Sequence, residues 1–431
     1  MPIPEIEPAS AAGPEPHPAA DPSGDVLLAR ALQLSSRIRG SAVEIRGGVV
    51  WLAPEAPPAP AGGAPAVLGP HLYDGASGIA LFLAALDHVR GDRANHDLVL
   101  GAIAPLRAKL RGLVLDPERA RTLRIPIGGL TGLGSFIYAL TRIGVWLGEP
   151  ALVAEAHALT TLLTPERIRS DEQLDVVAGA AGTVLALLAL HDASPPPSAS
   201  ASDPVELALA CARHLLDRRV SHEGRPRAWP CAGLPPLSGF AHGASGISHA
   251  LLRLHGWTGR EELRTAALEG FAYERSLFDR GALNWLDPRF GRLLEQSAWC
   301  HGAPGILLAR LGATSAGDGG DVAREDAALL LEAVRDAPDL PLDHLCCGNF
   351  GRGEVLACAG QALGDPGPLD AARALAGRSL RRADAGGDFH LAPVGEPPGL
   401  RPALFRGLAG IGYSLLRLAA PSALPSPLLL A

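Results

Sequence analysis

Residues 241–254 read AHGASGISHALLRL, and residues 300–311 read CHGAPGILLARL. In each stretch, two glycines three residues apart precede a run of apolar residues that has the pattern of a buried helix. The same G-x-x-G unit recurs at residues 73–86, 128–140, 177–190, 346–359 and 405–418, which makes seven units in all. Self-similarity of this kind is the signature of a repeat architecture.

The glycine pairs mark where the chain turns sharply into each apolar helix. Glycine tolerates positive φ and allows backbones to approach closely, so a structural role explains most of these residues. The pairs are Gly75/Gly78, Gly129/Gly132, Gly179/Gly182, Gly243/Gly246, Gly302/Gly305, Gly348/Gly351 and Gly407/Gly410. If the repeats are equivalent, the two residues before each first glycine all point towards one end of a central cavity.

Two classes of helix alternate along the sequence. The helices after the glycine pairs are apolar nearly all round and predict buried inner helices, whereas the segments between them are amphipathic. Outer helices are expected to start near Asp25, Asn95, Pro150, Asp203, Arg260, Asp321 and Leu369. Because buried helices need neighbours on every side, residues 26–431 are predicted to form an all-α fold. This is a closed, double-layered α/α toroid of seven inner and seven outer helices.

The composition excludes several classes of protein. Residues 1–25 are rich in Pro, Ala and acidic residues, which predicts a flexible tail. The formal net charge is -7 and the two signs are interspersed, so no basic surface for nucleic acid is expected. No apolar run reaches the roughly 18 residues of a transmembrane helix, and the N-terminus does not resemble a signal peptide. We therefore expect a cytoplasmic protein.

Three of the six cysteines occupy related positions in neighbouring units. The residues before the first glycine are Cys300 and His301 in the fifth unit and Cys346 and Cys347 in the sixth. Equivalent positions of adjacent repeats lie close together, so the three thiols should converge. Three convergent thiols predict a zinc ion with one open coordination position, which is typical of catalytic rather than structural zinc.

The other cysteines and the nearby histidines are less specific. His242 precedes the fourth glycine pair, one repeat from the thiols, which favours a role in the site over that of a core histidine. His301 and His344 either replace a thiol as ligand or form hydrogen bonds beside the site. The remaining three cysteines are interpreted as small buried apolar residues: Cys211, Cys231 and Cys358.

These units resemble the lanthionine cyclases, in particular the C-terminal cyclase domain of the bifunctional class II lanthipeptide synthetases. The resemblance runs from about Asp25 to the C-terminus, and its most specific elements are AHGASG, SAWCHGAPG and LCCGNFGRGEVL. It implies an α/α toroid and a zinc ion bound by Cys300, Cys346 and Cys347. This is a three-cysteine variant of the commoner site with two cysteines and one histidine. Three thiolates make the site negatively charged, so a bound substrate sulfur keeps more electron density.

The resemblance also implies roles for residues around the metal. The family's active-site histidine corresponds to His242, and its aspartate to Asp175. Some members have an arginine before the Trp-Cys element that assists formation of an enolate, but this chain has Gln296 there. Arg406 and Arg352 are the substitutes that the sequence offers.

The activity that the resemblance implies is the closure of thioether rings. Zinc would lower the pKa of a peptide cysteine thiol, and the thiolate would add to dehydroalanine or dehydrobutyrine to form lanthionine or methyllanthionine. His242 would act as general acid or base, oriented by Asp175. The partner would be a dehydrated precursor peptide. The long dehydratase of the bifunctional members has no counterpart before residue 25, so a separate or missing dehydratase is expected.

Two other interpretations remain open. A zinc-stabilised module of the same fold would bind a peptide or glutathione without turnover, and a fourth protein ligand would distinguish it. Helical toroids also host prenyltransferases and glycan-processing enzymes. A prenyltransferase needs an aromatic-lined channel, yet aromatic residues make up only 4% of the chain. A glycosidase needs paired carboxylates, and only Asp74 and Asp175 are expected near the cavity.

Overall fold

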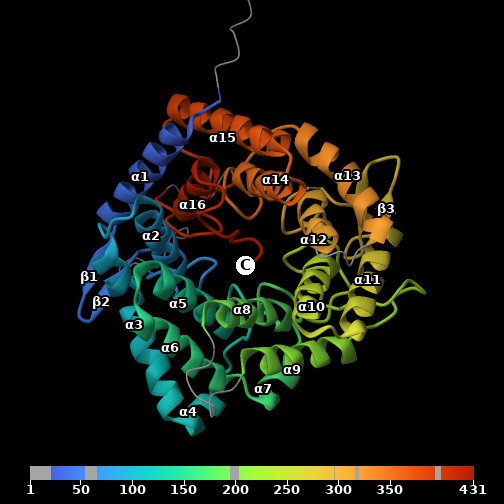
Figure 1. Cartoon of the computed structure of the whole chain (residues 1–431), viewed down its shortest axis with the longest axis horizontal. Coiled ribbons are helices and arrows are strands. Elements are labelled where there is room, and N and C mark those ends of the chain that lie inside the picture. Colours follow the sequence, from blue (N-terminus) through green and yellow to red (C-terminus); the bar gives the residue numbers. More distant parts are fainter. Residues whose placement is uncertain (1–20, 54–65, 195–202, 296, 316–319, 394–398) are drawn as a thin grey trace, which may run out of the picture.

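The computed structural model describes residues 21–53, 66–194, 203–295, 297–315, 320–393 and 399–431. Its longer helices form two concentric layers (Figure 1), so the predicted α/α toroid is confirmed. The inner layer consists of α2 (Ala76–Arg90), α5 (Leu133–Leu147), α8 (Ala180–Ala193), α10 (Ala244–Thr258), α12 (Ala303–Ser315), α14 (Asn349–Leu363) and α16 (Leu408–Ala419). The outer layer consists of α1 (Gly24–Gly40), α3 (His96–Leu115), α6 (Pro150–Leu159), α9 (Pro204–Asp217), α11 (Glu261–Ser276), α13 (Gly320–Asp336) and α15 (Pro366–Gly386).

The inner layer is a closed circle. Each inner helix contacts the next one from α2 to α16, and α16 contacts α2. Six inner helices pack on the outer helix that follows them in the chain, whereas α16 packs on α1. The first outer helix therefore completes the last hairpin. The predicted flexible tail, residues 1–25, lies mostly outside the described residues, and α1 begins at Gly24 with Ser23 as its cap.

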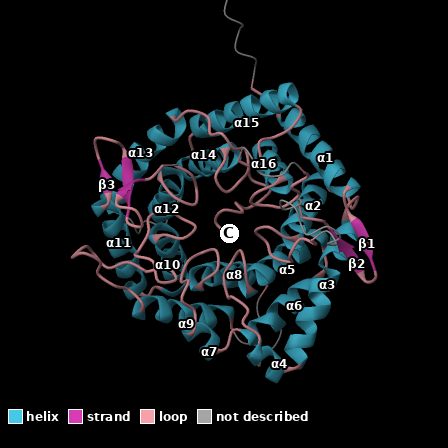
Figure 2. Cartoon of the chain, turned by 180° about the vertical axis from the view of Figure 1, so that it is seen from behind, coloured by secondary structure: helices cyan, strands magenta, loops and turns pink. Residues whose placement is uncertain are grey.

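The remaining elements are short. They are α4 (Pro117–Thr122), the 3-10 helix η1 (Thr160–Leu162) and α7 (Pro165–Arg169). Strands β1 (Val43–Ile45) and β2 (Gly48–Val50) form one antiparallel hairpin. Strands β3 (Phe278–Asp279), β4 (Asn284–Asp287) and β5 (Arg292–Leu293) form an antiparallel sheet in that order. Both sheets lie at the periphery of the ring (Figure 2). The second one belongs to the connection between α11 and α12, just before Cys300.

The structure corrects the predicted register of the second repeat. The N-cap of α5 is Gly132, whereas the sequence pattern assigned that position to Gly129. A Cβ atom on Gly132 would lie 2.3 Å from the carbonyl oxygen of Pro126, the same kind of overlap that requires glycine at the N-cap of α2. The sequence GGLTGLG contains several glycines at similar spacings. The pattern therefore predicted Gly129, and not Gly132, as the first glycine of the turn. The residues before the turn are therefore Leu130 and Thr131.

Backbone hydrogen bonds connect the turns before the inner helices from one repeat to the next. The N–H to oxygen pairs are Tyr73 to Leu130 (3.1 Å), Leu130 to Val177 (3.0 Å), Val176 to Ala241 (3.3 Å), Phe240 to Trp299 (3.4 Å), Cys346 to Phe405 (2.9 Å) and Phe405 to Tyr73 (2.9 Å). The described residues show no such bond between the fifth and sixth repeats. That junction is where the three predicted thiol ligands lie.

The C-terminal segment, residues 420–431, turns back from α16 into the middle of the ring (Figures 1 and 2). Leu430 is fully buried and lies against Gly129. The hydroxyl of Tyr138 on α5 donates to the carbonyl oxygen of Ala431 at 3.3 Å. Apolar side chains of this segment join the main core, so the segment packs against the inner helices.

A buried ion pair anchors the C-terminal segment. Arg417 of α16 pairs with Glu354 of α14, Nε to Oε1 at 2.7 Å, and both side chains are almost inaccessible to solvent. Arg417 also donates hydrogen bonds to the carbonyl oxygen of Leu424 and to Gln361 Oε1. Arg417 thus links two inner helices to the returning segment.

Candidate metal centre

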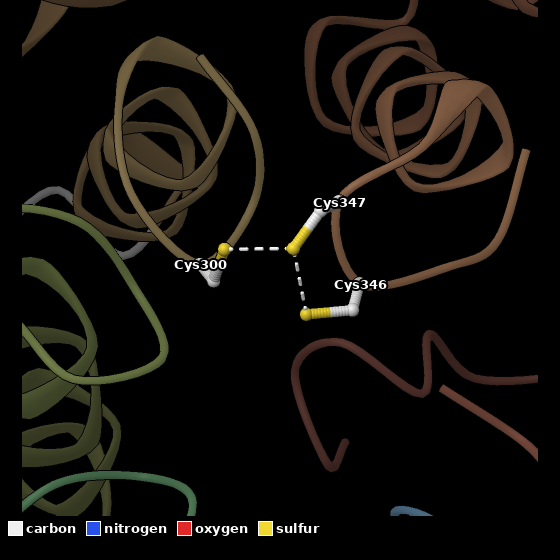
Figure 3. Close-up of side chains that lie close together, drawn as sticks. All are labelled: Cys300, Cys346 and Cys347. Atoms are coloured by element: carbon white, nitrogen blue, oxygen red, sulfur yellow. Dashed lines mark hydrogen bonds between the residues drawn. The ribbon is translucent and has the colours of Figure 1, made fainter. Parts of the chain in front are cut away.

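The three predicted thiols converge at the junction between the fifth and sixth repeats. Cys347 Sγ lies 3.1 Å from Cys300 Sγ and 3.2 Å from Cys346 Sγ (Figure 3). Cys300 comes from the turn before α12, and the other two come from the turn before α14. Their ligand atoms form a compact group that could hold a metal ion. The equivalence of the repeats was sufficient to predict this meeting.

The electrostatics of the cluster favour ionisation of one thiol. Hydrogen bonds from Cys300 and Cys346 lower the pKa of Cys347. Hydrogen bonds with Cys300 and Cys347, together with burial, raise the pKa of Cys346 well above the usual value. Three sulfur donors of this kind suit a thiophilic cation and not Mg²⁺ or Ca²⁺. The donor set therefore fits the predicted zinc ion.

Backbone contacts hold the cysteine turn before α14 in place. His344 is buried, and its Nδ1 accepts the backbone N–H of Cys347 at 3.2 Å. Burial lowers the pKa of His344. His344 thus positions the turn through its Nδ1. Arg352 donates to the carbonyl oxygens of Ala337 and Pro338, both at 2.7 Å, so it braces the preceding loop.

His242 and Asp175 form a hydrogen-bonded pair near the thiols. His242 Nδ1 lies 2.6 Å from Asp175 Oδ2, and the aspartate side chain is only 1% exposed while the imidazole is 39% exposed. The other carboxylate oxygen accepts the backbone N–H groups of Ala178 at 2.7 Å and Gly179 at 3.2 Å. The N-terminal turn of α8 therefore fixes Asp175. With Nδ1 bound to the carboxylate, Nε2 of His242 is the nitrogen left for a substrate.

A buried network fixes the turn that carries His242. Glu274 of α11 accepts the backbone N–H groups of Gly239 at 2.9 Å and Ser245 at 3.0 Å. Arg310 of α12 pairs with the same carboxylate at 3.1 Å, and neither side chain is accessible. Through Glu274, the turn of the fourth repeat is thus connected to helix α12 of the fifth repeat.

His301 follows Cys300 in the chain and lies beside His242. Its ring centroid is 5.8 Å from that of His242. Its Nδ1 lies 3.4 Å from the carbonyl oxygen of Ser238, which fixes the ring orientation. Burial, followed by the charge of Arg289, lowers the pKa of His301.

Arg289, which lies near Cys300, was not among the residues that the sequence analysis singled out. It follows β4, and its Nε and Nη2 bind both oxygens of Asp287 at 2.8–3.2 Å. The two residues help to line a cavity of about 200 Å³ that also contains Cys300 and His301. The hydrogen bond that Arg289 donates to Asp287 raises the pKa of Arg289, and the charges of Asp287 and Cys300 add to this effect. Only the Asp-x-Arg spacing could have indicated this pair.

Tyr73 is another neighbour that the sequence did not assign. Its ring stacks on Phe405 with centroids 4.9 Å apart. Burial, and then the charge of Cys346, raises the pKa of Tyr73. The phenol therefore stays protonated beside the thiols.

The other residues that the sequence analysis named differ in their burial. Asp74 and Arg406 are exposed at their turns, and Gln296 lies outside the described residues. Cys211 and Cys358 are buried, as predicted. Cys231 is buried too, but its Sγ lies 3.6 Å from Asp175 Oδ2, which the sequence did not indicate. None of the helices among the described residues has the length and apolar composition needed to cross a membrane.

The match to one solved structure, nisin cyclase, agrees with the fold. Nisin cyclase matches with a TM-score of 0.56 and 16% identity over 84% of this chain and 92% of its own. Dfg5 from Chaetomium thermophilum matches with a TM-score of 0.45 and 12% identity over 94% of this chain and 90% of its own. Cellobiose 2-epimerase from Spirochaeta thermophila matches with a TM-score of 0.42 and 13% identity over 74% of this chain and 97% of its own. None of the curated protein sequences matches the chain significantly.

The sequence itself matches one family model over most of its length. Residues 66–429 match the model of the lanthionine synthetase C-like proteins. That range contains all seven glycine turns, the three thiols and the His242–Asp175 pair. The chain therefore belongs to the lanthionine synthetase C-like family.

Proposed function

We propose that this protein is a zinc-dependent lanthipeptide cyclase, which adds peptide cysteine thiols to dehydroalanine or dehydrobutyrine. The observation that carries the proposal is the composition of the thiol cluster. Among the described residues, no fourth His, Cys, Asp or Glu joins Cys300, Cys346 and Cys347. A zinc ion held by three protein ligands keeps one position open for a substrate atom.

The proposal assigns the metal to the three cysteines and the proton transfer to His242. Zinc bound there would lower the pKa of a substrate thiol, which makes the sulfur a nucleophile at neutral pH. His242 Nε2 would take the thiol proton or deliver a proton to the α-carbon of the acceptor residue. Asp175 would hold the imidazole in the tautomer with the Nδ1 proton and would stabilise its charged form. The buried backbone bonds of Asp175 support this role.

Addition of sulfur to a dehydrated residue places negative charge on the adjacent carbonyl oxygen. Arg289 is suited to stabilise that charge because Asp287 binds only one edge of its guanidinium. Its Nη1 has no partner among the described residues. Electrostatic stabilisation by a fixed donor is usually a large part of catalysis. In this proposal Arg289 takes the role for which the sequence offered Arg406 and Arg352.

The substrate in this proposal is a dehydrated, cysteine-containing peptide, and its dehydrated residues come from a dehydratase. The cavity next to Cys300 has an apolar side formed by Phe290, Leu294 and Ala298, together with the charged pair Asp287 and Arg289. Such a mixed surface suits a peptide segment that flanks the reacting cysteine.

One experiment tests the proposal directly. The full chain is incubated with a dehydrated, cysteine-containing peptide, and the free thiols that remain are alkylated and counted by mass spectrometry. We expect thiols to be lost with zinc-loaded protein and retained after chelation. A protein that binds the peptide and zinc but leaves every thiol free would instead be a non-catalytic binding module.

A further inference from the structure

We infer that Asp175, Cys231 and His242 form a second metal site, which binds a thiophilic divalent cation such as Zn²⁺. The ligand atoms of all three residues lie within 4.8 Å of one another. Only the consequence for catalysis rests on the proposed function, because metal binding itself requires no turnover. The site is separate from the three-cysteine cluster and shares no residue with it.

The distances between donor atoms are close to those of a tetrahedral zinc site. Bond lengths of about 2.0 Å to N or O and about 2.3 Å to S place neighbouring ligand atoms roughly 3.3–3.7 Å apart. Cys231 Sγ and Asp175 Oδ2 already lie 3.6 Å apart. His242 Nδ1 and Asp175 Oδ2 lie 2.6 Å apart. This contact must open by about 0.7 Å, and the imidazole nitrogen and Cys231 Sγ lie within 4.8 Å of each other. The imidazole is partly exposed, so it has room for this movement.

The two buried ligands are held in place independently of any metal. Asp175 receives backbone N–H groups from the turn before α8 on its second oxygen. Cys231 lies in a tight turn in which Cys231 and Leu234 exchange backbone hydrogen bonds of 3.3 and 2.9 Å. The next residue, Ala232, has a φ of +48°, a strained value for a residue with a Cβ atom. The N–H of Ala232 donates to the carbonyl oxygen of Glu172, which maintains that conformation.

The charge of the donor set suits a buried position. One thiolate and one carboxylate neutralise a divalent cation, so no net charge is left in the protein interior. Burial and the charge of Asp175 raise the pKa of Cys231 to about 12, with a smaller contribution from Asp171. Without metal, the thiol is therefore protonated and faces Asp175.

The mixed donor set should bind zinc less tightly than three thiolates do. At one equivalent of zinc the three-cysteine cluster fills first, and the second site fills only with excess metal. An occupied second site replaces the hydrogen bond between His242 Nδ1 and Asp175. The imidazole then cannot act as the general acid or base, so excess zinc inhibits cyclisation.

Metal titration tests the inference on the full chain. Apo protein is titrated with Co²⁺ at pH 8, and bound metal and thiolate-to-cobalt absorption are followed. We expect the wild type to bind two equivalents of Co²⁺ and Cys231→Ser to bind one. His242→Asn should also bind one equivalent, which keeps the test valid if the serine variant folds poorly. Cys211→Ala, which alters a buried cysteine outside both sites, should bind two. A wild type that binds one equivalent, or a second equivalent that survives in both site variants, overturns the inference.

A rate measurement separates this inference from the proposed function. Cyclisation is measured at one and at ten equivalents of zinc, with each variant normalised to its own rate at one equivalent. We expect at least a five-fold inhibition of the wild type and none of Cys231→Ser. If the wild type forms no rings but binds two metal ions, the proposed function fails and the second site stands. If rings form but only one metal binds, the second site fails.

Discussion

The backbone N–H of Phe405 donates to the carbonyl oxygen of Tyr73 at 2.9 Å, and the two side chains stack on each other. This contact joins the seventh repeat to the first and closes the circle of turns. The corresponding backbone bond is not present between the fifth and sixth repeats among the described residues. At that junction the thiols of Cys300 and Cys347 meet instead. A metal ion there would therefore also connect two repeats.

Removing zinc should lower stability as well as activity. A ligand present at a thousand times its Kd stabilises the folded state by about 4 kcal/mol. We expect Cys347→Ser to lose stoichiometric zinc and to unfold at a temperature several degrees lower than the zinc-loaded wild type. Calorimetry with and without a chelator measures the shift. With Cys231→Ser added to remove the second site, the variant should show no further shift in unfolding temperature when the chelator is added, and a large shift would contradict the assignment of Cys347.

Replacing His242 should separate metal binding from proton transfer. His242→Asn and Asp175→Asn should retain zinc in the three-cysteine cluster, while ring formation slows by about 10²–10⁴-fold, the usual contribution of a general acid or base. Metal content and thiol loss are measured on the same samples. Wild-type rates in His242→Asn would remove the residue from the mechanism.

Both the position and the charge of Arg289 should contribute to the rate of ring closure. Arg289→Gln should reduce the rate constant for ring closure by about 10²-fold, as the loss of one donor to a developing oxyanion does elsewhere. Arg289→Lys should recover only part of the rate because it cannot bind Asp287 with two parallel bonds. Arg280→Gln, at the exposed turn between β3 and β4, is the matched control. Equal effects at positions 280 and 289 would indicate a general charge effect.

Breaking the ion pair behind the C-terminal segment should destabilise the fold. Glu354→Gln leaves the charge of Arg417 unpaired in the core, which costs about 3–5 kcal/mol. The double variant with Arg417→Met should recover much of the loss. Urea unfolding measures the free energy of unfolding of both variants. The surface pair of Arg378 with Asp339 provides the comparison, and Arg378→Gln should cost less than about 1 kcal/mol.

Acid should destabilise the protein through His249. Burial, and then the charge of Arg253, lowers the pKa of His249 from 6.5 to about 3. Below pH 6.5 the unfolded chain binds a proton that the folded chain does not, so stability is complete above pH 6.5 and falls as the pH decreases towards 3. Between pH 6.5 and pH 5 the loss is about 2 kcal/mol.

Urea unfolding at pH 7.5 and pH 5, with a chelator in all samples, isolates this effect from loss of zinc. His249→Leu should reduce the difference in stability between the two pH values by about 2 kcal/mol. An unchanged difference would mean that another group is responsible, and the buried His157, whose pKa is also lowered by burial, would be the next to test.

The repeats made much of this structure predictable from the sequence. Equivalent turns determine which residues are neighbours, so the positions of Cys300 and Cys346 alone implied a thiol cluster. The same reasoning failed at Gly132, where extra glycines allow more than one register. It also could not find Arg289 or the contact of Cys231 with Asp175. Both depend on where connections between helices fold back, which periodicity does not describe.

The C-terminal segment lies in the middle of the ring, where Leu430 is buried against Gly129 (Figure 1). The cavity beside Cys300 is lined instead by residues of β4, β5 and their connections, such as Asp287, Arg289 and Leu293. Under the proposed function, the small β3–β5 sheet at the edge of the molecule would therefore limit the size of the thioether ring that can form.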